Sequence, residues 1–350
     1  MKQLFVLFVA AVFAFGGLNA HAALINGHNY TPLGDWARAN GFYGFTRDHG
    51  REIVLTNRMA RLVFDVDSAQ AEINGVNVRL SFPVANVKGV PFIAQLDLDQ
   101  TIRPLLYPAR YVTPKKITTI CLDPGHGGKD TGNRVGGAFF GHSEKTYTLA
   151  LAQELRDQLK RAGFNVILTR NKDMYVDLPL RPDIANQCGA DLFVSLHFNA
   201  IQAGKNEVQG PETYCITPVG AASSNAQGEG GSYGATTANR SEYQSLLLAY
   251  QMEKSLVRNL GVADRGVRRA RFAVLRDAAM PAILVEGGYM THPGEAKRIF
   301  DAAYRRQMAA AMVRGILAYQ KLTAATVPLP VATANHSSPK PAGAAGHFTN

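Results

Sequence analysis

Cysteine is scarce in this chain, with only Cys121, Cys188 and Cys215 among 350 residues. An odd number leaves at least one cysteine unpaired in a monomer, and three are too few for a disulfide framework. The sequence leaves open whether Cys188 and Cys215 pair. With an apolar fraction of 46%, the chain has material for two domains, and the fold must depend mainly on its hydrophobic core.

Long hydrophobic runs are also missing, apart from one near the first residue. Lys2 is followed by an apolar run from Leu4 to Leu18 and then by Ala20-His21-Ala22, the pattern of a secretory signal peptide. The run is too short to cross a bilayer comfortably, and no cysteine precedes Cys121 to carry a lipid anchor. We expect cleavage after Ala22 and a soluble product, exported to the periplasm or the cell wall without a membrane anchor.

Acidic residues are outnumbered, since 37 lysines and arginines face 27 aspartates and glutamates, a net charge of +10. Removing residues 1–22 takes away Lys2 and no acid, so the charge falls by one to +9. The basic residues show none of the signatures of RNA-binding domains, zinc fingers or basic zippers, so we do not expect nucleic acid as a partner. For an exported protein, an acidic polymer of the cell envelope is the better counterpart.

Residues 23–114 predict a small α+β module. Short β-like runs dominate, and Asn74-Gly75 predicts a type I′ hairpin because both residues tolerate positive φ. Residues 31–40 and 95–106 are expected to be short helices. Ile73-Asn74-Gly75 and the segments after it loosely resemble the copper amine oxidase N-terminal-like domain. The resemblance implies no copper here, since His28 and His49 lack a partner at metal-ligand spacing.

Residues 115–322 predict an α/β domain, with a mostly parallel sheet and helices on both faces. Residues 323–350 are rich in Ala, Pro and Ser and are expected to form a disordered tail. Within the domain, the apolar patterns predict strands at 117–122, 165–169, 191–197, 212–217, 272–275 and 282–285, helices at 144–162, 181–187, 241–259, 293–300 and 303–322, and a mobile loop at 218–240.

A glycine-rich turn carries His126 just after the first of these strands. The turn does not match a phosphate-binding P-loop, because Gly128-Lys129 is followed by Asp130 and no glycine lies at the required distance before it. Taken alone, His126 could be an ordinary turn histidine. A metal site requires partners elsewhere in the chain.

Three further residues are expected at the same edge of the sheet: Glu144 at the start of a helix, His197 at the end of a strand and Glu286 after another. Glu144 after Ser143 could simply be the start of a capped helix, and His197 could be a hydrogen-bonded core residue. Glu286 is harder to explain in this way, because burying its carboxylate without a nearby cation is costly. Two imidazoles and one carboxylate can bind a catalytic zinc.

Four motifs resemble, in order, those of the zinc-dependent N-acetylmuramoyl-L-alanine amidases of bacterial cell-wall turnover. They are Leu122-Asp-Pro-Gly-His-Gly-Gly, Glu144-Lys145, Ser195-Leu-His-Phe-Asn-Ala and Leu284-Val-Glu-Gly-Gly-Tyr. The similarity covers residues 117 to about 320. It implies Zn²⁺ held by His126, Glu144 and His197, Glu286 as catalytic acid and base, and cleavage of the bond between muramic acid and L-alanine in peptidoglycan.

Other residues are weaker candidates. Asp123 and Asn199 adjoin the expected ligands and are predicted to orient them. Arg269 and Arg271 belong to a basic run at 265–276 that could pair with carboxylates of the peptidoglycan stem peptide, or could be solvated surface. Residues 218–240 show no apolar helix of the kind that blocks the site in some relatives.

Two other functions stay open: a zinc peptidase acting within the stem peptide, and a non-enzymatic wall-binding protein. The sequence does not indicate an activator or a targeting role for the first module.

Overall fold

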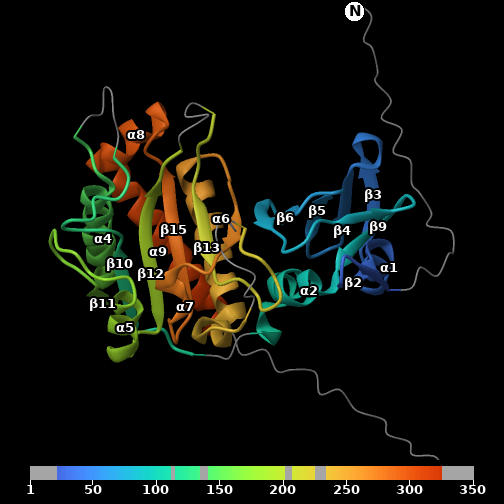
Figure 1. The fold of residues 1–350 in the computed structure, drawn as a ribbon, viewed down its shortest axis with the longest axis horizontal. Helices are drawn as coiled ribbons and strands as arrows, with labels where there is room; N and C mark the ends of the chain where they lie inside the picture. Colours follow the sequence, from blue (N-terminus) through green and yellow to red (C-terminus); the bar gives the residue numbers. More distant parts are fainter. Residues whose placement is uncertain (1–21, 112–114, 135–140, 202–206, 225–233, 325–350) are drawn as a thin grey trace, which may run out of the picture.

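The computed structural model describes residues 22–111, 115–134, 141–201, 207–224 and 234–324. The predicted signal peptide, except Ala22, and the predicted tail beyond residue 324 lie outside the described residues. Figure 1 shows two bodies, a larger one of helices around a sheet and a smaller one built mainly of strands.

The smaller body is the predicted N-terminal module. One sheet has the order β1-β2-β9-β8, and the strands from β3 to β7 form an antiparallel meander. Asn74 and Gly75 connect β6 to β7 with φ of 50° and 77°, so the predicted hairpin is confirmed. The elements are β1 Ala23–Ile25, β2 His28–Pro32, α1 Leu33–Ala39, β3 Tyr43–Arg47, η1 Asp48–Gly50, β4 Glu52–Thr56, β5 Arg61–Asp65, β6 Gln70–Ile73, β7 Val76–Arg79, β8 Ala85–Val87 and β9 Val90–Ala94.

A helical segment leads out of this module, as predicted for residues 95–106. It consists of α2 Gln95–Asp97, a π-helical turn η2 Leu98–Ile102 and α3 Arg103–Leu106, and a 3₁₀ turn η3 Pro108–Arg110 follows. Leu98 and Ile102 are fully buried, so the segment packs one apolar face into the core.

In the described residues, the larger body contains six strands in the order β11-β10-β12-β15-β13-β14. Strands β11, β10, β12 and β15 are parallel, β13 runs antiparallel to β15, and β14 is parallel to β13. The predicted mostly parallel α/β sheet is therefore confirmed. The strands are β10 Thr119–Pro124, β11 Asn165–Leu168, β12 Leu192–Asn199, β13 Glu212–Cys215, β14 Val267–Arg269 and β15 Ala282–Tyr289.

Helices cover both faces of this sheet (Figure 1). On one face, α4 Glu144–Arg161, α6 Glu242–Leu260 and α9 Ala302–Ala324 pack in the large core cluster, with α8 Pro293–Phe300 beside α9. On the other, α5 Leu180–Gln187 and α7 Ala273–Arg276 cover a smaller cluster that includes Cys121, Phe193 and Leu284. Alternate residues of each buried strand therefore contribute to the two cores.

Three local predictions differ from the structure. The strand predicted at 272–275 is wrong, since a short apolar run does not distinguish strand from helix and the N–H groups of Leu275 and Arg276 bond back to Phe272. The tail predicted from Thr323 is wrong for its first two residues, because α9 continues to Ala324 and Thr323 is buried. The strands predicted to end at residues 197 and 285 continue to Asn199 and Tyr289.

Part of the predicted loop at 218–240 is ordered. A 3₁₀ turn, η5 Thr237–Ser241, precedes α6, and Thr236 and Asn239 form a capping box. Residues 225–233 of the predicted loop lie outside the described residues.

The two bodies share one continuous sheet. Val267 of β14 pairs with Val78 of β7, which extends the order to eleven strands. The Asn77 side chain donates to the Asp264 carbonyl, and the Tyr250 hydroxyl donates to the Ile73 carbonyl at 2.8 Å. The module is therefore docked on the larger body by backbone pairing and buried hydrogen bonds.

Candidate metal centre

His126 lies on the glycine-rich turn directly after β10. Its φ of 63° is in the left-handed region, which a residue with a side chain occupies only when its surroundings hold it there. A Cβ at Gly127 would overlap with the carbonyl oxygen of Met174, so the turn packs too closely for a larger residue. Nδ1 of His126 lies 2.8 Å from Oδ2 of Asp130, which leaves Nε2 to face the neighbouring residues.

Two buried arginines hold the backbone of this turn. Arg170 donates to the carbonyls of Pro124 and Gly125, at 2.9 and 2.8 Å. Arg181 donates to the carbonyl of His126 at 3.0 Å. Both side chains are at most 2% exposed, so these hydrogen bonds are shielded from water and strong.

Glu144 is the first residue of α4 and is 1% exposed. Its Oε2 lies 3.0 Å from His126 Nε2, and its Oε1 lies 2.9 Å from His197 Nδ1. The backbone N–H groups of Asn133 and Phe198 also donate to the carboxylate. Burial acts to raise the pKa of Glu144, but the hydrogen bonds from the two histidines outweigh it and hold the pKa well below its usual range.

His126, Glu144 and His197 are thus brought together as the sequence predicted, with one ligand atom of each within 4.8 Å of the others. Burial acts to lower the pKa of His126, but Glu144 and then Asp130 raise it above its ordinary value. A Cβ at Gly125 would overlap with the His197 ring, so glycine is needed for this approach. Two imidazoles and a carboxylate are a donor set that could hold a metal ion.

Glu286 lies beside this group on β15, where it pairs with His197 of β12. Its Oε2 is buried and has no hydrogen-bond partner among the described residues. Burial raises the pKa of Glu286 well above its ordinary value, and the negative charges of Glu144 and Glu212 raise it further. Such a carboxyl group is suited to holding and releasing a proton.

Sequence reasoning did not identify Glu212, which pairs with Glu286 across β13 and β15 and is 2% exposed. Oε1 accepts a hydrogen bond from Arg265 Nε at 2.6 Å and from the Tyr289 hydroxyl at 2.8 Å. Oε2 accepts one from the Tyr214 hydroxyl at 2.7 Å. Burial acts to raise the pKa of Glu212, but Arg268, Tyr214 and Arg265 outweigh it and lower the pKa.

Asp130 was also missed. It lies four residues after His126 in the same turn. Only the structure shows that its carboxylate is next to Nδ1 of His126. Nδ1 of a histidine that ligates a metal through Nε2 often bonds a carboxylate in this way.

The weaker candidates lie further from the three ligands. Asp123 accepts hydrogen bonds from Thr169, Arg181 and Ser195, so it reaches His126 only through Arg181. Asn199 donates to Glu212 at 3.4 Å. Among the described residues, neither side chain is hydrogen-bonded to the side chain of His126, Glu144 or His197, so any orienting effect through hydrogen bonds is indirect.

Arg269 and Arg271 both donate hydrogen bonds to backbone carbonyls of the protein. Arg269 is 3% exposed and donates to the carbonyls of Ile216 and of Gln100 in the N-terminal module. It pairs with Cys215 on β13 and so points to the face opposite Glu286. Arg271 donates to the carbonyl of Pro218 at 2.8 Å. Arg269 is therefore not free to bind a substrate carboxylate and instead joins the two bodies.

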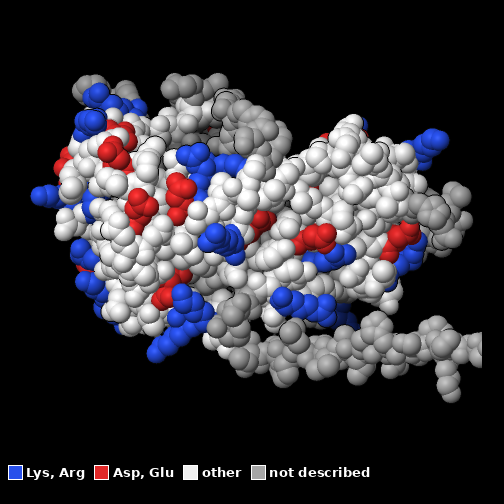
Figure 2. Space-filling view, turned by 60° about the horizontal axis from the view of Figure 1, so that its bottom comes forward, with Lys and Arg blue, Asp and Glu red and all other residues white. Residues whose placement is uncertain are grey.

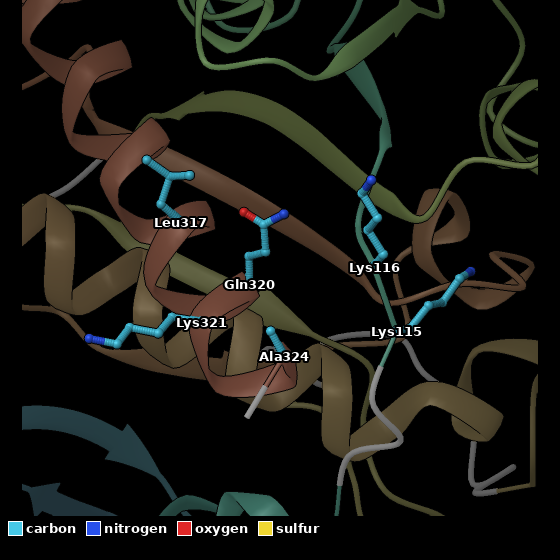
Figure 3. Close-up of a pocket in the computed structure, with 6 residues that line it drawn as sticks. All are labelled: Lys115, Lys116, Leu317, Gln320, Lys321 and Ala324. Carbon is cyan, nitrogen blue, oxygen red and sulfur yellow. The ribbon is translucent and has the colours of Figure 1, made fainter. Parts of the chain in front are cut away.

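A pocket of about 440 Å³ lies at the other end of the sheet. Figure 3 shows that it is lined by Lys115 and Lys116, on the segment leading into β10, and by side chains of α9. His126 follows the opposite end of β10, so this pocket is separate from the candidate metal centre.

Charge is spread over the surface. On the face shown in Figure 2, lysines and arginines lie in several separate groups, with aspartates and glutamates between them. The excess of basic residues on this face is not gathered into one strip. None of the helices in the described segments is long and apolar enough to cross a membrane.

The three cysteines are free in the structure, and Cys188 is exposed whereas Cys215 is buried. The two do not pair, which answers the question that the sequence left open.

Comparison with known proteins identifies the family. Residues 120–318 match the family model described as N-acetylmuramoyl-L-alanine amidase. The chain is 34% identical to the amidase AmiC of Neisseria meningitidis over 223 residues, covering 57% of this chain and 52% of that protein. It is 31% identical to AmiA of Escherichia coli, with 57% and 75% covered.

A solved amidase from Clostridium difficile 630 is 32% identical, with a TM-score of 0.48, and the match covers 59% of this chain and 98% of that one. The chain spans about half the length of the neisserial relative. Because the family model covers more than half of its residues, the chain belongs to the N-acetylmuramoyl-L-alanine amidase family.

Proposed function

We propose that this chain is an exported zinc hydrolase that cleaves the amide bond between N-acetylmuramic acid and L-alanine in peptidoglycan. The observation that carries the proposal is the position of Glu286. Glu286 lies on β15 and pairs with His197 of β12, which belongs to the group of His126, Glu144 and His197. Its Oε2 is buried and has no hydrogen-bond partner among the described residues. Family membership supports the choice of bond, because the neisserial and E. coli relatives are named for this activity.

In this proposal His126, Glu144 and His197 would hold the zinc ion. Nε2 of His126 and Nδ1 of His197 both face the Glu144 carboxylate, and Asp130 fixes the orientation of the His126 ring from its other nitrogen. Bound there, zinc would supply the polarisation of the amide carbonyl and the acidification of water that hydrolysis of an unactivated amide requires.

Glu286 would move the proton during the reaction. It accepts a proton from the attacking water and delivers it to the nitrogen of L-alanine as the C–N bond breaks. General acid–base catalysis of this kind contributes roughly a hundred- to ten-thousandfold. Burial, and then the negative charges of Glu144 and Glu212, raise the pKa of Glu286 and favour keeping the proton once it is taken, whereas a bound cation would favour the ionised carboxylate that first accepts it.

The proposed substrate fits the expected destination of the protein. The predicted signal peptide and the formal charge of +9 without it favour an anionic envelope polymer as the partner. A zinc peptidase acting within the stem peptide would use the same residues, so the position of the cleaved bond distinguishes the two functions. A wall-binding protein without activity would have no use for Glu286.

The decisive experiment is analysis of the products from purified peptidoglycan. We expect release of stem peptides with free L-alanine amino groups, no new glycan reducing ends, loss of activity with a chelator and recovery with zinc. The Glu286→Gln protein is the matched inactive control. New amino groups on other stem residues would instead indicate a peptidase, and new reducing ends a glycosidase.

A further inference from the structure

A row of polar side chains crosses four neighbouring strands on the face of the sheet that carries Glu286. His197 on β12 pairs with Glu286 on β15, and Glu286 pairs with Glu212 on β13. Tyr214, two residues after Glu212 on the same face, pairs with Arg268 on β14. Arg268 is two strands from Glu286 and two residues further along the sheet, so with about 4.8 Å between strands and 3.4 Å per residue the two backbones are roughly 12 Å apart. Arg268 therefore lies along the same face as the candidate metal centre.

This end of the row carries more positive than negative charge. Arg265 Nε is 2.6 Å and Arg268 Nη2 is 3.3 Å from the same Glu212 oxygen, so two guanidinium groups share one carboxylate. The hydroxyls of Tyr214 and Tyr289 also donate to that carboxylate and leave it little capacity for further bonds. One positive charge is therefore not balanced by Glu212.

The described residues do not satisfy the Arg268 guanidinium fully. Its Nε is buried and makes no hydrogen bond with any described residue, although a buried donor without a partner costs free energy. Its side chain is 21% exposed, and that of Arg265 is 29% exposed. Arg265 is held more firmly, since its guanidinium also lies 5.3 Å from the Tyr289 ring centre. The two arginines are thus ordered on the protein side and accessible on the other.

We propose that Arg268 and Arg265 form an anion subsite, which binds a carboxylate of the peptide part of the substrate beyond the cleaved amide. Glu212 acts as the counter-ion that positions both guanidinium groups. The subsite rests on the proposed function, because it assumes that a peptide extends from the metal centre along this face. An extended peptide covers about 3.3–3.6 Å per residue, so a carboxylate two or three residues past the cleaved bond would reach Arg268.

The test compares two synthetic muramoyl peptides, one with free carboxylates on the stem and one with the corresponding carboxamides. Wild-type protein should prefer the carboxylate form. A hydrogen bond to a charged group contributes about 1.5–3 kcal/mol, so Arg268→Gln should raise KM for the carboxylate form roughly 10- to 100-fold. KM for the carboxamide form should change less than about twofold, because that substrate presents no charge to Arg268. Arg268→Lys should recover only part of the preference, because lysine lacks the planar fork of donors.

Arg276→Gln is the matched control, because Arg276 belongs to the same basic run but is exposed on α7. It should leave the preference for the carboxylate form unchanged. Equal losses on both substrates in Arg268→Gln, or a wild type without preference, would overturn the subsite and leave Arg268 as a structural partner of Glu212.

Binding of the free stem peptide to the zinc-loaded protein tests the subsite without hydrolysis. Calorimetry should show weaker binding for the Arg268 variants than for wild type, and equal binding would contradict the proposal. If wild-type protein cleaves neither substrate, the proposed function fails, whereas the binding data still decide whether the subsite exists.

Discussion

Two carboxyl groups near opposite ends of the same sheet have opposite surroundings. Asp191, just before β12, accepts hydrogen bonds from the N–H groups of Thr118 and Thr119 and from the Thr118 hydroxyl. The Lys115 ammonium lies 2.7 Å from its other oxygen. Glu286, in the second half of β15, faces other carboxylates and has a buried oxygen without a partner.

The difference shows that donors and neighbouring charges, rather than burial alone, decide what a carboxyl group does. Burial acts to raise the pKa of Asp191, but Lys115 and the donors from Thr118 and Thr119 outweigh it and lower the pKa to about 2. For Glu286 nothing offsets burial, and nearby negative charge adds to it. Asp191 stabilises the fold, whereas the ionised form of Glu286 costs free energy in its surroundings and the group is suited to proton transfer.

The largest effect is expected from Glu286→Gln. Since glutamine can neither take nor deliver the proton, kcat should fall by roughly a hundred- to ten-thousandfold. Stability should change little, because glutamine has nearly the same shape as glutamate and Oε2 of Glu286 has no hydrogen-bond partner among the described residues. The measurements are hydrolysis rate, zinc content and thermal unfolding. An active variant, or one that has lost its zinc, would contradict the role proposed for Glu286.

Asp130→Asn should have the next largest effect and tests how far the ligands depend on their neighbours. Asparagine is a weaker acceptor for Nδ1 of His126, and loss of such an outer partner typically costs 10- to 100-fold in metal affinity. Competition with a chromogenic chelator measures the affinity. Asp157→Asn, a change at a half-exposed residue of α4, serves as the control. Equal zinc affinity in both variants would mean that Asp130 does not support His126.

Much of the candidate site could be predicted because each residue lies in, or directly next to, a strongly patterned strand or helix. His126 follows a strand of β-branched and apolar residues, Glu144 begins a strongly patterned helix, and the His197 and Glu286 strands read as buried runs. The edge of a parallel α/β sheet brings such positions together whatever the loop conformations are.

The supporting residues could not be predicted in the same way. Arg170 and Arg181 act on the backbone of a turn more than forty positions earlier, and Glu212 depends on the reversed direction of β13. These contacts depend on side-chain directions and strand order, which local patterns do not specify. For the same reason the sequence did not indicate that β14 would pair with β7 and join the module to the sheet.

Asp191→Asn is expected to change stability and leave hydrolysis unaffected, the reverse of Glu286→Gln. A folded pKa of about 2 against an ordinary value of 3.8 corresponds to about 2 kcal/mol at neutral pH. Because the folded pKa is depressed, this stabilisation is present above pH 4 and is lost as the pH falls toward 2. Urea unfolding of both proteins between pH 7 and pH 3 measures the difference, which should shrink at the acid end. A difference that does not depend on pH would assign the loss to packing instead.

Lys115→Met should have the smallest effect and separates the contributions to the Asp191 site. The Lys115 side chain is 63% exposed, so its ion pair is screened by solvent and should contribute less than about 1 kcal/mol. The donors from Thr118 and Thr119 remain in this variant, and they should retain most of the stabilisation. Urea unfolding at low and high salt measures the contribution, which should decrease as salt rises. If Lys115→Met were as destabilising as Asp191→Asn, the ion pair rather than the backbone donors would account for the contrast between Asp191 and Glu286.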